Sequence, residues 1–490
     1  MNLYFITKKL KPLVTTIALL ACLSTNVVFA QSQNKNKLPE IGAAAASVLS
    51  LDKERQIGDI MMRQLRASQP IINDPVLIEY INHLGNRLVK NAQDVNYRFK
   101  FFLINRKAIN AFAFFGGHVA VHSSLVTLAD NESELASVLA HEISHVTQRH
   151  LARRLESQKR SQPLTTAGMI SGVLLALVNP TIGFAALTTT IAASKQLSIN
   201  YTRGNEKEAD RVGIALLANS GFDPQGAPEF FNKLADKFRY ASKPPPMLLT
   251  HPLPNSRISD ARTRAQNYPF VHLAPSLNFE LAKARIHARY QGNAKDNITL
   301  YKDQISRKKY RIKAAAQYGL AISYFENKQY KQAEKILTKL ITAAPKNLFY
   351  VDVLADVYVQ TKQFKTAIAM LNKLNLLMPN NQVVTLNYAN VLLAAGQLNK
   401  SAELLQDFLL VQNDNFIAYD LLTEVYTKQE RTSMMHANKA EIYALLGAYP
   451  RAIDELQTAI KFAGKKVLIK KRIKARILQF QSQADKIKRL

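Results

Sequence analysis

The chain has 490 residues, 65 of them lysine or arginine and 36 aspartate or glutamate, for a formal net charge of +29. This length is enough for two or three domains. The charge indicates either anionic partners or a role in solubility alone. A secretory N-terminus and the lack of any nucleic-acid-binding motif exclude nucleic acid. The single cysteine excludes a fold held together by disulfides.

The first 30 residues have the pattern of a secretory signal peptide. A lysine-rich start precedes an apolar core from Val14 to Leu20, and Val28-Phe29-Ala30 forms a small-residue cleavage site. Leu19-Leu20-Ala21-Cys22 also resembles a lipoprotein signal, with Cys22 as the acylated residue. Because the apolar stretch continues to Ala30, we favour ordinary cleavage after residues 1–30, with lipoprotein anchoring through Cys22 as the alternative.

Residues Phe112 to Leu125 are rich in β-branched and aromatic side chains around Gly116-Gly117. This composition predicts a hairpin or a bent strand ahead of the next helix. His118 and His122 fall in this segment. We interpret them as ordinary polar residues of a strand, with contact to substrate or metal as the alternative.

The pentapeptide His141-Glu142-Ile143-Ser144-His145 has the spacing of a metal site on a helix. Histidines four apart share one helical face, so both rings can reach one metal ion. Glu142 directly follows the first histidine on the helix, so its carboxylate can hold a water molecule beside the metal ion and take its proton. Asn131 and Glu134 predict the start of this helix. The alternative is a buried helix with two satisfied histidines.

A long apolar segment, 164–194, follows the histidine pair and is interrupted by Asn179-Pro180. Each arm is shorter than the roughly 20 residues that a membrane span requires. We therefore expect an apolar helical hairpin. It either packs on the protein core or lies at a membrane interface.

The segment Asn205 to Gly213 supplies carboxylates at helical spacing, because Glu206 and Asp210 lie four residues apart. A hydrolytic zinc site takes three protein ligands and keeps a fourth position for water, so Glu206 is the expected third ligand beside the histidine pair. Asp210 can then fix the tautomer of one ligand histidine. We expect Glu208 to be a solvated carboxylate. An ordinary charged helix surface is the alternative for the whole segment.

Repetition begins at about residue 277. Tyr330-x-x-Ala333, Phe364-x-x-Ala367 and Leu398-x-x-Ser401 recur every 34 residues. This period, with a small residue at the close-packing position, is typical of tetratricopeptide repeats, whose helix pairs stack into a superhelix that binds partner segments. Tyr449-x-x-Ala452 is a further copy out of register, and Leu281 to Tyr290 belongs to a candidate earlier one.

The end of the chain, 465–490, predicts a strongly basic helix with Ile469, Ile473 and Ile477 on one face. We interpret it as a capping helix with a solvated outer face. A binding site for acidic partners is the alternative.

Together the motifs resemble a peptidase family. His-Glu-x-x-His followed by Glu-x-x-x-Asp is the pattern of the gluzincin peptidases related to the CAAX-prenyl and HtpX-type membrane proteases, and Asn110–Gly117 and Thr250–Pro254 fit it. Over nearly its full length the chain is most similar to the BepA-type periplasmic metalloproteases. The resemblance implies a mainly α fold. A helical zinc-metalloprotease domain with a small β-sheet, 31–270, would precede an α-solenoid of tetratricopeptide repeats, 277–490.

The resemblance also implies the site. One Zn²⁺ per chain would be held by His141, His145 and Glu206, and the catalytic residues would be Glu142, as general base, and Asp210.

Two further groups follow from the resemblance alone. His251 and Arg257 would lie at the active site, where His251 would either stabilise the oxyanion or latch the open position of the zinc ion. A strand would form the edge to which a substrate peptide adds. The substrate-strand candidates are Phe112, Phe114, Gly116 and Gly117.

The implied function is a periplasmic endopeptidase that degrades misassembled outer-membrane β-barrel proteins and assists their assembly. The implied partners are those proteins, the barrel-assembly machinery, the lipopolysaccharide-transport barrel and, peripherally, the membrane. The alternative from another class is a chaperone or assembly scaffold with a latched, rarely active zinc site. Glu142 favours the enzyme, because a scaffold needs no water-activating carboxylate. A general housekeeping protease would not require the repeats.

Overall fold

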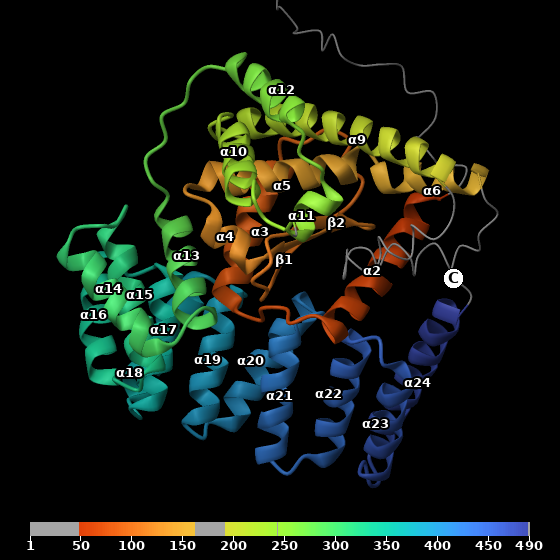
Figure 1. Cartoon of the computed structure of the whole chain (residues 1–490). Helices are drawn as coiled ribbons and strands as arrows, with labels where there is room; N and C mark the ends of the chain where they lie inside the picture. The colour runs from red at the N-terminus through yellow and green to blue at the C-terminus, as the bar shows by residue number, and fades with distance from the viewer. Residues whose placement is uncertain (1–48, 162–191, 243, 489–490) are drawn as a thin grey trace, which may run out of the picture. The chain divides into compact units, whose positions relative to one another are not determined.

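The computed structural model describes residues 49–161, 192–242 and 244–488 (Figure 1). These residues form helices and one three-stranded sheet, which confirms the mainly α fold. The expected signal peptide, Cys22 and nearly all of the apolar segment 164–194 lie outside the described residues. Within the described ranges, no helix combines the length and the apolar character that a membrane crossing requires.

The first half of the chain surrounds the sheet with helices. Its elements are α2 (Leu51–Ser68), α3 (Pro75–Val89), β1 (Lys100–Ile104), β2 (Ala111–Phe114), β3 (His118–His122), α4 (Ser123–Leu128), α5 (Glu132–Thr147), α6 (His150–Ser161), α9 (Ala192–Asn219), α10 (Gly226–Phe238), α11 (Pro246–Thr250) and α12 (Asn255–Gln266). The strand order is β1-β3-β2, with β1 parallel and β2 antiparallel to β3. Helix α3 packs against β1 and α5 against β2, so the predicted metal helix rests on the sheet.

The predicted hairpin is confirmed, since β2 and β3 are joined by Phe115, Gly116 and Gly117. Both glycines have positive φ, +76° and +80°, a conformation that other residues rarely adopt. A Cβ atom at Gly117 would also come within 2.9 Å of the Tyr97 side chain. The turn therefore depends on glycine.

Strand β2 lies at one edge of the sheet, and no strand in the described ranges pairs with its outer side. Its register decides which peptide groups face that free edge. The Asn110 carbonyl accepts a hydrogen bond from the His122 N–H at 3.0 Å. Because bonded pairs alternate along an antiparallel ladder, Phe112 and Phe114 also direct their peptide groups at β3. The peptide groups of the alternate residues, Ala111 and Ala113, face the free edge.

Helix α5 begins where the sequence predicts. The Asn131 Oδ1 atom accepts from the Glu134 N–H at 2.9 Å, and the Glu134 carboxylate accepts from the Asp130 N–H at 2.8 Å. Helix α9 crosses α5 at Gly213, where an added Cβ would lie 3.1 Å from the backbone nitrogen of His141. This close approach brings the carboxylates of α9 beside the histidine pair.

The second half of the chain consists of helices stacked in sequence order. They are α13 (Leu277–Tyr290), α14 (Ala294–Ser306), α15 (Lys313–Glu326), α16 (Tyr330–Ala343), α17 (Leu348–Gln360), α18 (Phe364–Leu377), α19 (Gln382–Ala394), α20 (Leu398–Val411), α21 (Phe416–Lys428), α22 (Thr432–Leu445), α23 (Tyr449–Lys461) and α24 (Val467–Lys488). Helices α16, α18 and α20 begin at the three motif positions, which confirms the 34-residue repeat. The small residue of each motif is fully buried.

The out-of-register copy has a simple structural cause. Helix α22 begins at Thr432, one full repeat after Leu398, and Tyr449 begins the very next helix. The motif is therefore displaced by one additional helix, or half a repeat. Beyond it, Ile473 and Phe480 of α24 are buried against α23.

A buried ionic cluster connects the repeat helices to the first half. Arg285 of α13 is fully buried, and its guanidinium donates to Asp74 at 2.7 Å, to Asp352 of α17 at 2.5 Å and to the Tyr318 hydroxyl at 2.8 Å. Asp74 is also the N-cap of α3, where it accepts from the N–H groups of Val76 and Leu77. One arginine thus ties the start of α3 to two repeat helices.

Candidate metal centre and active site

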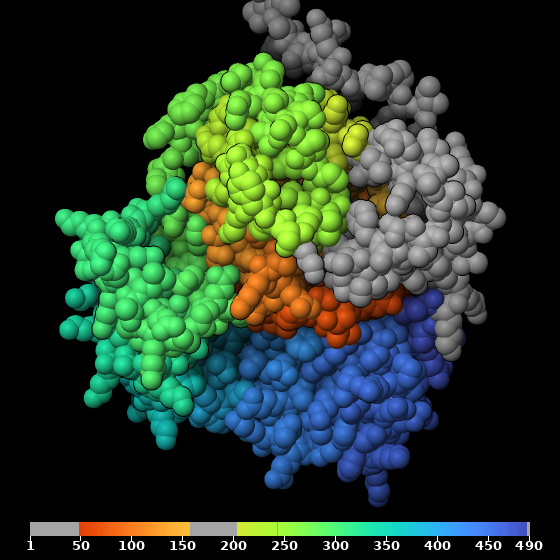
Figure 2. Space-filling model, in the orientation of Figure 1, coloured from red at the N-terminus to blue at the C-terminus, as the bar shows by residue number. Residues whose placement is uncertain are grey.

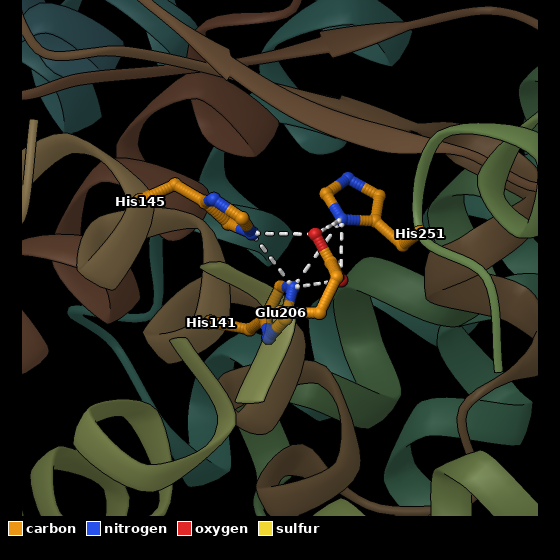
Figure 3. A group of neighbouring side chains, drawn as sticks. All are labelled: His141, His145, Glu206 and His251. Atoms are coloured by element: carbon orange, nitrogen blue, oxygen red, sulfur yellow. Dashed lines mark hydrogen bonds and ion pairs between the residues drawn. The ribbon is translucent and has the colours of Figure 1, made fainter. Parts of the chain in front are cut away.

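Four side chains from distant parts of the chain converge on one point (Figure 3). His141 and His145 come from α5, Glu206 from α9, and His251 from the residue after α11. One ligand-type atom from each lies within 4.8 Å of the others. The two Nε2 atoms of α5 are 3.0 Å apart, and the His251 Nδ1 atom is 3.1 Å from both Glu206 carboxylate oxygens. The expected ligands are therefore brought together, and His251 joins them.

The donor atoms fit a zinc ion. Three imidazole nitrogens and one carboxylate match the ligand types and the four-coordinate number that zinc prefers. The site is shielded from solvent, because His141 and Glu206 are 7% and 3% exposed. Lone-pair atoms this close together in a buried site repel one another unless a cation or a proton lies between them.

Asp210 lies where the sequence predicts, with its Oδ1 atom 3.0 Å from the His141 Nδ1 atom. Arg257 donates to both Asp210 oxygens at 2.7 and 2.8 Å and to Glu206 at 2.9 Å. Burial opposes a charge on His141, but the carboxylates of Asp210 and Glu206 outweigh it and raise its pKa to about 10. Arg257 therefore lies at the site, as expected, and holds the two carboxylates of α9 in place.

Glu142 is 1% exposed, and among the described residues its Oε1 atom has no hydrogen-bond partner. That atom lies 3.5 Å from the His251 Nε2 atom, at the border of the cluster. A buried carboxylate oxygen with a free lone pair beside a metal site is what a general base requires.

The prediction that Glu208 is a solvated carboxylate holds only in part, because its side chain is 29% exposed but is also paired. Its Oε2 atom accepts from His150 at 3.1 Å and from Arg153 at 2.6 Å. The hydrogen bond from His150 and the Arg153 guanidinium, working against burial, lower its pKa to about 2. His150, which the sequence analysis missed, also lies with its Nδ1 atom 2.8 Å from the His145 Nδ1 atom. The sequence feature that could have indicated His150 is the presence of a further histidine shortly after the pair His141 and His145.

The strand histidines do not belong to the cluster. The His118 Nδ1 atom is 3.0 Å from the Phe115 carbonyl, and the His122 Nδ1 atom is 2.7 Å from the Ala108 carbonyl. Both are buried in β3, which fits the interpretation as polar strand residues. The substrate-strand candidates Phe112 and Phe114 are likewise buried.

Helix α11 connects the edge strand to the metal cluster. The Met247 N–H donates to the Ile109 carbonyl at 3.3 Å, just before β2, and the chain then delivers His251. In Figure 2 the yellow-green surface of α10 to α12 lies over the orange part that contains the sheet and α5. A small pocket beside His141 and His251 has an apolar lining of Val138, Phe231, Leu234, Met247, Leu248 and Leu253.

Known proteins share this arrangement of domains. Residues 77–265 match peptidase family M48, and residues 315–347 and 358–425 match tetratricopeptide repeats. The chain is 49% identical to the putative beta-barrel assembly-enhancing protease of Vibrio cholerae, over 96% of this chain and 98% of the relative. The chain belongs to this protease family. It is also 42% identical to the beta-barrel assembly-enhancing protease of Escherichia coli, over 93% of this chain and 94% of that one.

Family membership confirms the predicted enzyme class, a metalloendopeptidase. The M48 match runs from α3 to α12, so it includes α5, α9 and His251. The Escherichia coli metalloprotease LoiP is 28% identical over 50% of this chain and 96% of its own length.

Proposed function

We propose that this protein is a zinc-dependent endopeptidase of the periplasm that cleaves misassembled outer-membrane β-barrel proteins and assists their assembly. The observation that carries the proposal is the cluster of His141, His145, Glu206 and His251 beside the buried Glu142 Oε1 atom, which accepts no hydrogen bond from the part of the chain that the structure describes. The names of the full-length relatives support the client class. The signal-type sequence at residues 1–30 supports the periplasm.

Each residue would have a defined task. When bound, one zinc ion would lower the pKa of a water molecule and polarise a peptide carbonyl. Glu142 would accept the proton from that water at Oε1 and pass it to the leaving amide nitrogen. Asp210 would keep the proton of His141 on Nδ1, which leaves Nε2 free as a ligand. Arg257 would offset part of the negative charge of the two carboxylates that it contacts.

His251 fits a latch better than an oxyanion donor. Its Nδ1 atom points among the ligand atoms, 3.3 Å from the His141 Nε2 atom. A fourth protein ligand there would occupy the position that water needs. The hydrogen bond from Met247 to Ile109 fixes α11 at the start of the substrate edge, so a peptide entering along β2 would displace the same segment. Substrate entry and release of His251 would then be one event.

The free edge of β2 is the proposed substrate strand, with Ala111 and Ala113 offering the peptide groups. An unfinished barrel presents unpaired strands, which suit such an edge. The repeats over 277–490 would bind the client or the barrel-assembly machinery and present it to the protease part over 31–270. The lipopolysaccharide-transport barrel and the membrane surface are further candidate partners of a chain with this positive charge.

Comparison of the wild type with Glu142→Gln tests the proposal. Both proteins would be checked for one bound zinc by elemental analysis and incubated with an unfolded outer-membrane barrel protein, and cells would be scored for barrel assembly. We expect cleavage to be lost with zinc retained, and assembly to fail under stress. If Glu142→Gln supported assembly fully, the scaffold alternative would replace the protease. If the wild type bound no metal, the zinc assignment would fail.

A further inference from the structure

The side of His145 that faces away from the metal cluster has its own chain of polar contacts. We propose that His150 and Glu208 are positioning residues that orient His145 and strengthen its hold on the metal ion. The inference rests on the metal site of the proposed function. Asp210 supports the other ligand histidine, whereas His145 has no direct carboxylate on its Nδ1 side among the described residues.

The proton positions follow from the geometry. To bind a metal through Nε2, which faces the cluster, His145 must carry its proton on Nδ1. That atom is 2.8 Å from the His150 Nδ1 atom, so the His150 nitrogen must accept. The proton of His150 then lies on Nε2, 3.1 Å from the Glu208 carboxylate. In this series of contacts from His145 to Glu208, every donor meets an acceptor. Only this assignment leaves the His145 Nε2 atom able to bind a metal ion.

His150 is enclosed, whereas the Glu208 side chain is 29% exposed and is also held by a cation. His150 is 4% exposed, so water does not replace its contacts readily. The Arg153 guanidinium, 2.6 Å from Glu208, anchors the far end. A metal ligand whose second ring nitrogen is hydrogen-bonded keeps its tautomer and ring orientation, and loss of such a partner typically weakens metal binding by roughly 10–100-fold.

The backbone is shaped to make this contact. In an unbroken helix, residues five apart point about 140° away from each other, so His150 could not reach His145. Instead α5 ends at Thr147, Arg149 takes a positive φ of +51°, and α6 starts at His150. A residue other than glycine in this conformation costs about 1–2 kcal/mol.

Buried contacts stabilise that turn. The Arg149 guanidinium donates to Glu54 of α2 at 2.5 and 3.1 Å and to the Leu49 carbonyl at 2.7 Å. Tyr97 donates its hydroxyl to the same Glu54 carboxylate. Arg149 is thus held in a strained conformation by buried contacts, and this conformation turns His150 toward the metal ligand His145. Such strain indicates a constraint set by the site.

The test compares four single variants with the wild type. His150→Phe keeps a ring and removes both hydrogen bonds, His150→Asn keeps an acceptor at the Nδ1 position, and Glu208→Gln removes the charge. The control is His436→Phe in α22, which breaks a similar histidine–glutamate contact of 2.6 Å far along the chain in the repeats. Zinc affinity would be measured by competition with a chelator, and thermal stability on the metal-free proteins.

We expect His150→Phe to weaken zinc binding by roughly 10–100-fold, Glu208→Gln by roughly tenfold, and His150→Asn by less than about threefold. Without metal, the thermal unfolding midpoints of His150→Phe and His436→Phe should fall by similar amounts. The proposal is overturned if His150→Phe binds zinc within about threefold of the wild type, or if His150→Asn is as weak as His150→Phe. A wild type without zinc affinity would instead overturn the proposed function.

Discussion

Replacement of Arg285 by methionine should destabilise the protein by about 3–5 kcal/mol, because it removes the nearest cation from two buried carboxylates. The Asp74 and Asp352 side chains are only 2% and 6% exposed. Both keep neutral partners. Tyr290 donates to Asp74 at 3.1 Å beside the N–H groups of Val76 and Leu77, and Asn387 donates to Asp352 at 2.8 Å.

A second cation limits the loss. The Arg289 guanidinium lies 3.9 Å from both carboxylates and remains in the variant. The expected loss is therefore that of one broken buried pair and not of two. The effect should also depend on pH. Burial raises the pKa of Asp74, but Arg285 and Arg289 reverse this and hold it below its usual value. Without Arg285 burial prevails, so the carboxyl takes a proton more easily and the destabilisation shrinks as the pH falls from about 7 to 5.

Urea titrations followed by far-ultraviolet circular dichroism would measure these differences. The control, Arg239→Met, breaks an exposed ion pair with Asp236 and should change stability by less than about 0.5 kcal/mol. The double variant Arg285→Met/Asp352→Asn should lose at least about 1 kcal/mol less than the sum of its single variants. A loss below about 1 kcal/mol in Arg285→Met at pH 7 would refute the argument that this cluster joins the two halves.

Three further predictions concern the active site. Because its pKa is raised to about 10, His141 is protonated in the metal-free protein at neutral pH, so zinc must displace that proton. Zinc affinity should then rise about tenfold per pH unit between about pH 6 and 8, and a flat profile in chelator competition would contradict this. His251→Ala should raise the cleavage rate of an unfolded barrel protein several-fold while zinc stays bound, and a lower rate would favour the oxyanion role. Ala113→Pro removes an outward N–H without breaking the pairing with β3, so kcat/KM for extended substrates should fall roughly tenfold, the value of one hydrogen bond. Unchanged kcat/KM would exclude β2 as the substrate strand.

Features that depend on local periodicity can be predicted from the sequence alone. Helical spacing of four residues shows that His141 and His145 share a face, and a constant 34-residue step shows the repeats. The glycines of the β2–β3 turn were also visible, because only glycine adopts their conformation readily. These signals lie within one element or one turn, so no knowledge of the rest of the fold is needed to interpret them.

Which elements meet, and which atoms they present to one another, depends on the packing of the whole fold. Spacing made Glu208 look like a solvent-facing residue, but the break at Arg149 turns His150 toward it. The sequence suggested Phe112 and Phe114 as substrate-strand residues. In the register of β2 on β3, however, the peptide groups that face away from β3 belong to Ala111 and Ala113. Such contacts depend on packing between segments far apart in sequence, which leaves no period in the chain to detect.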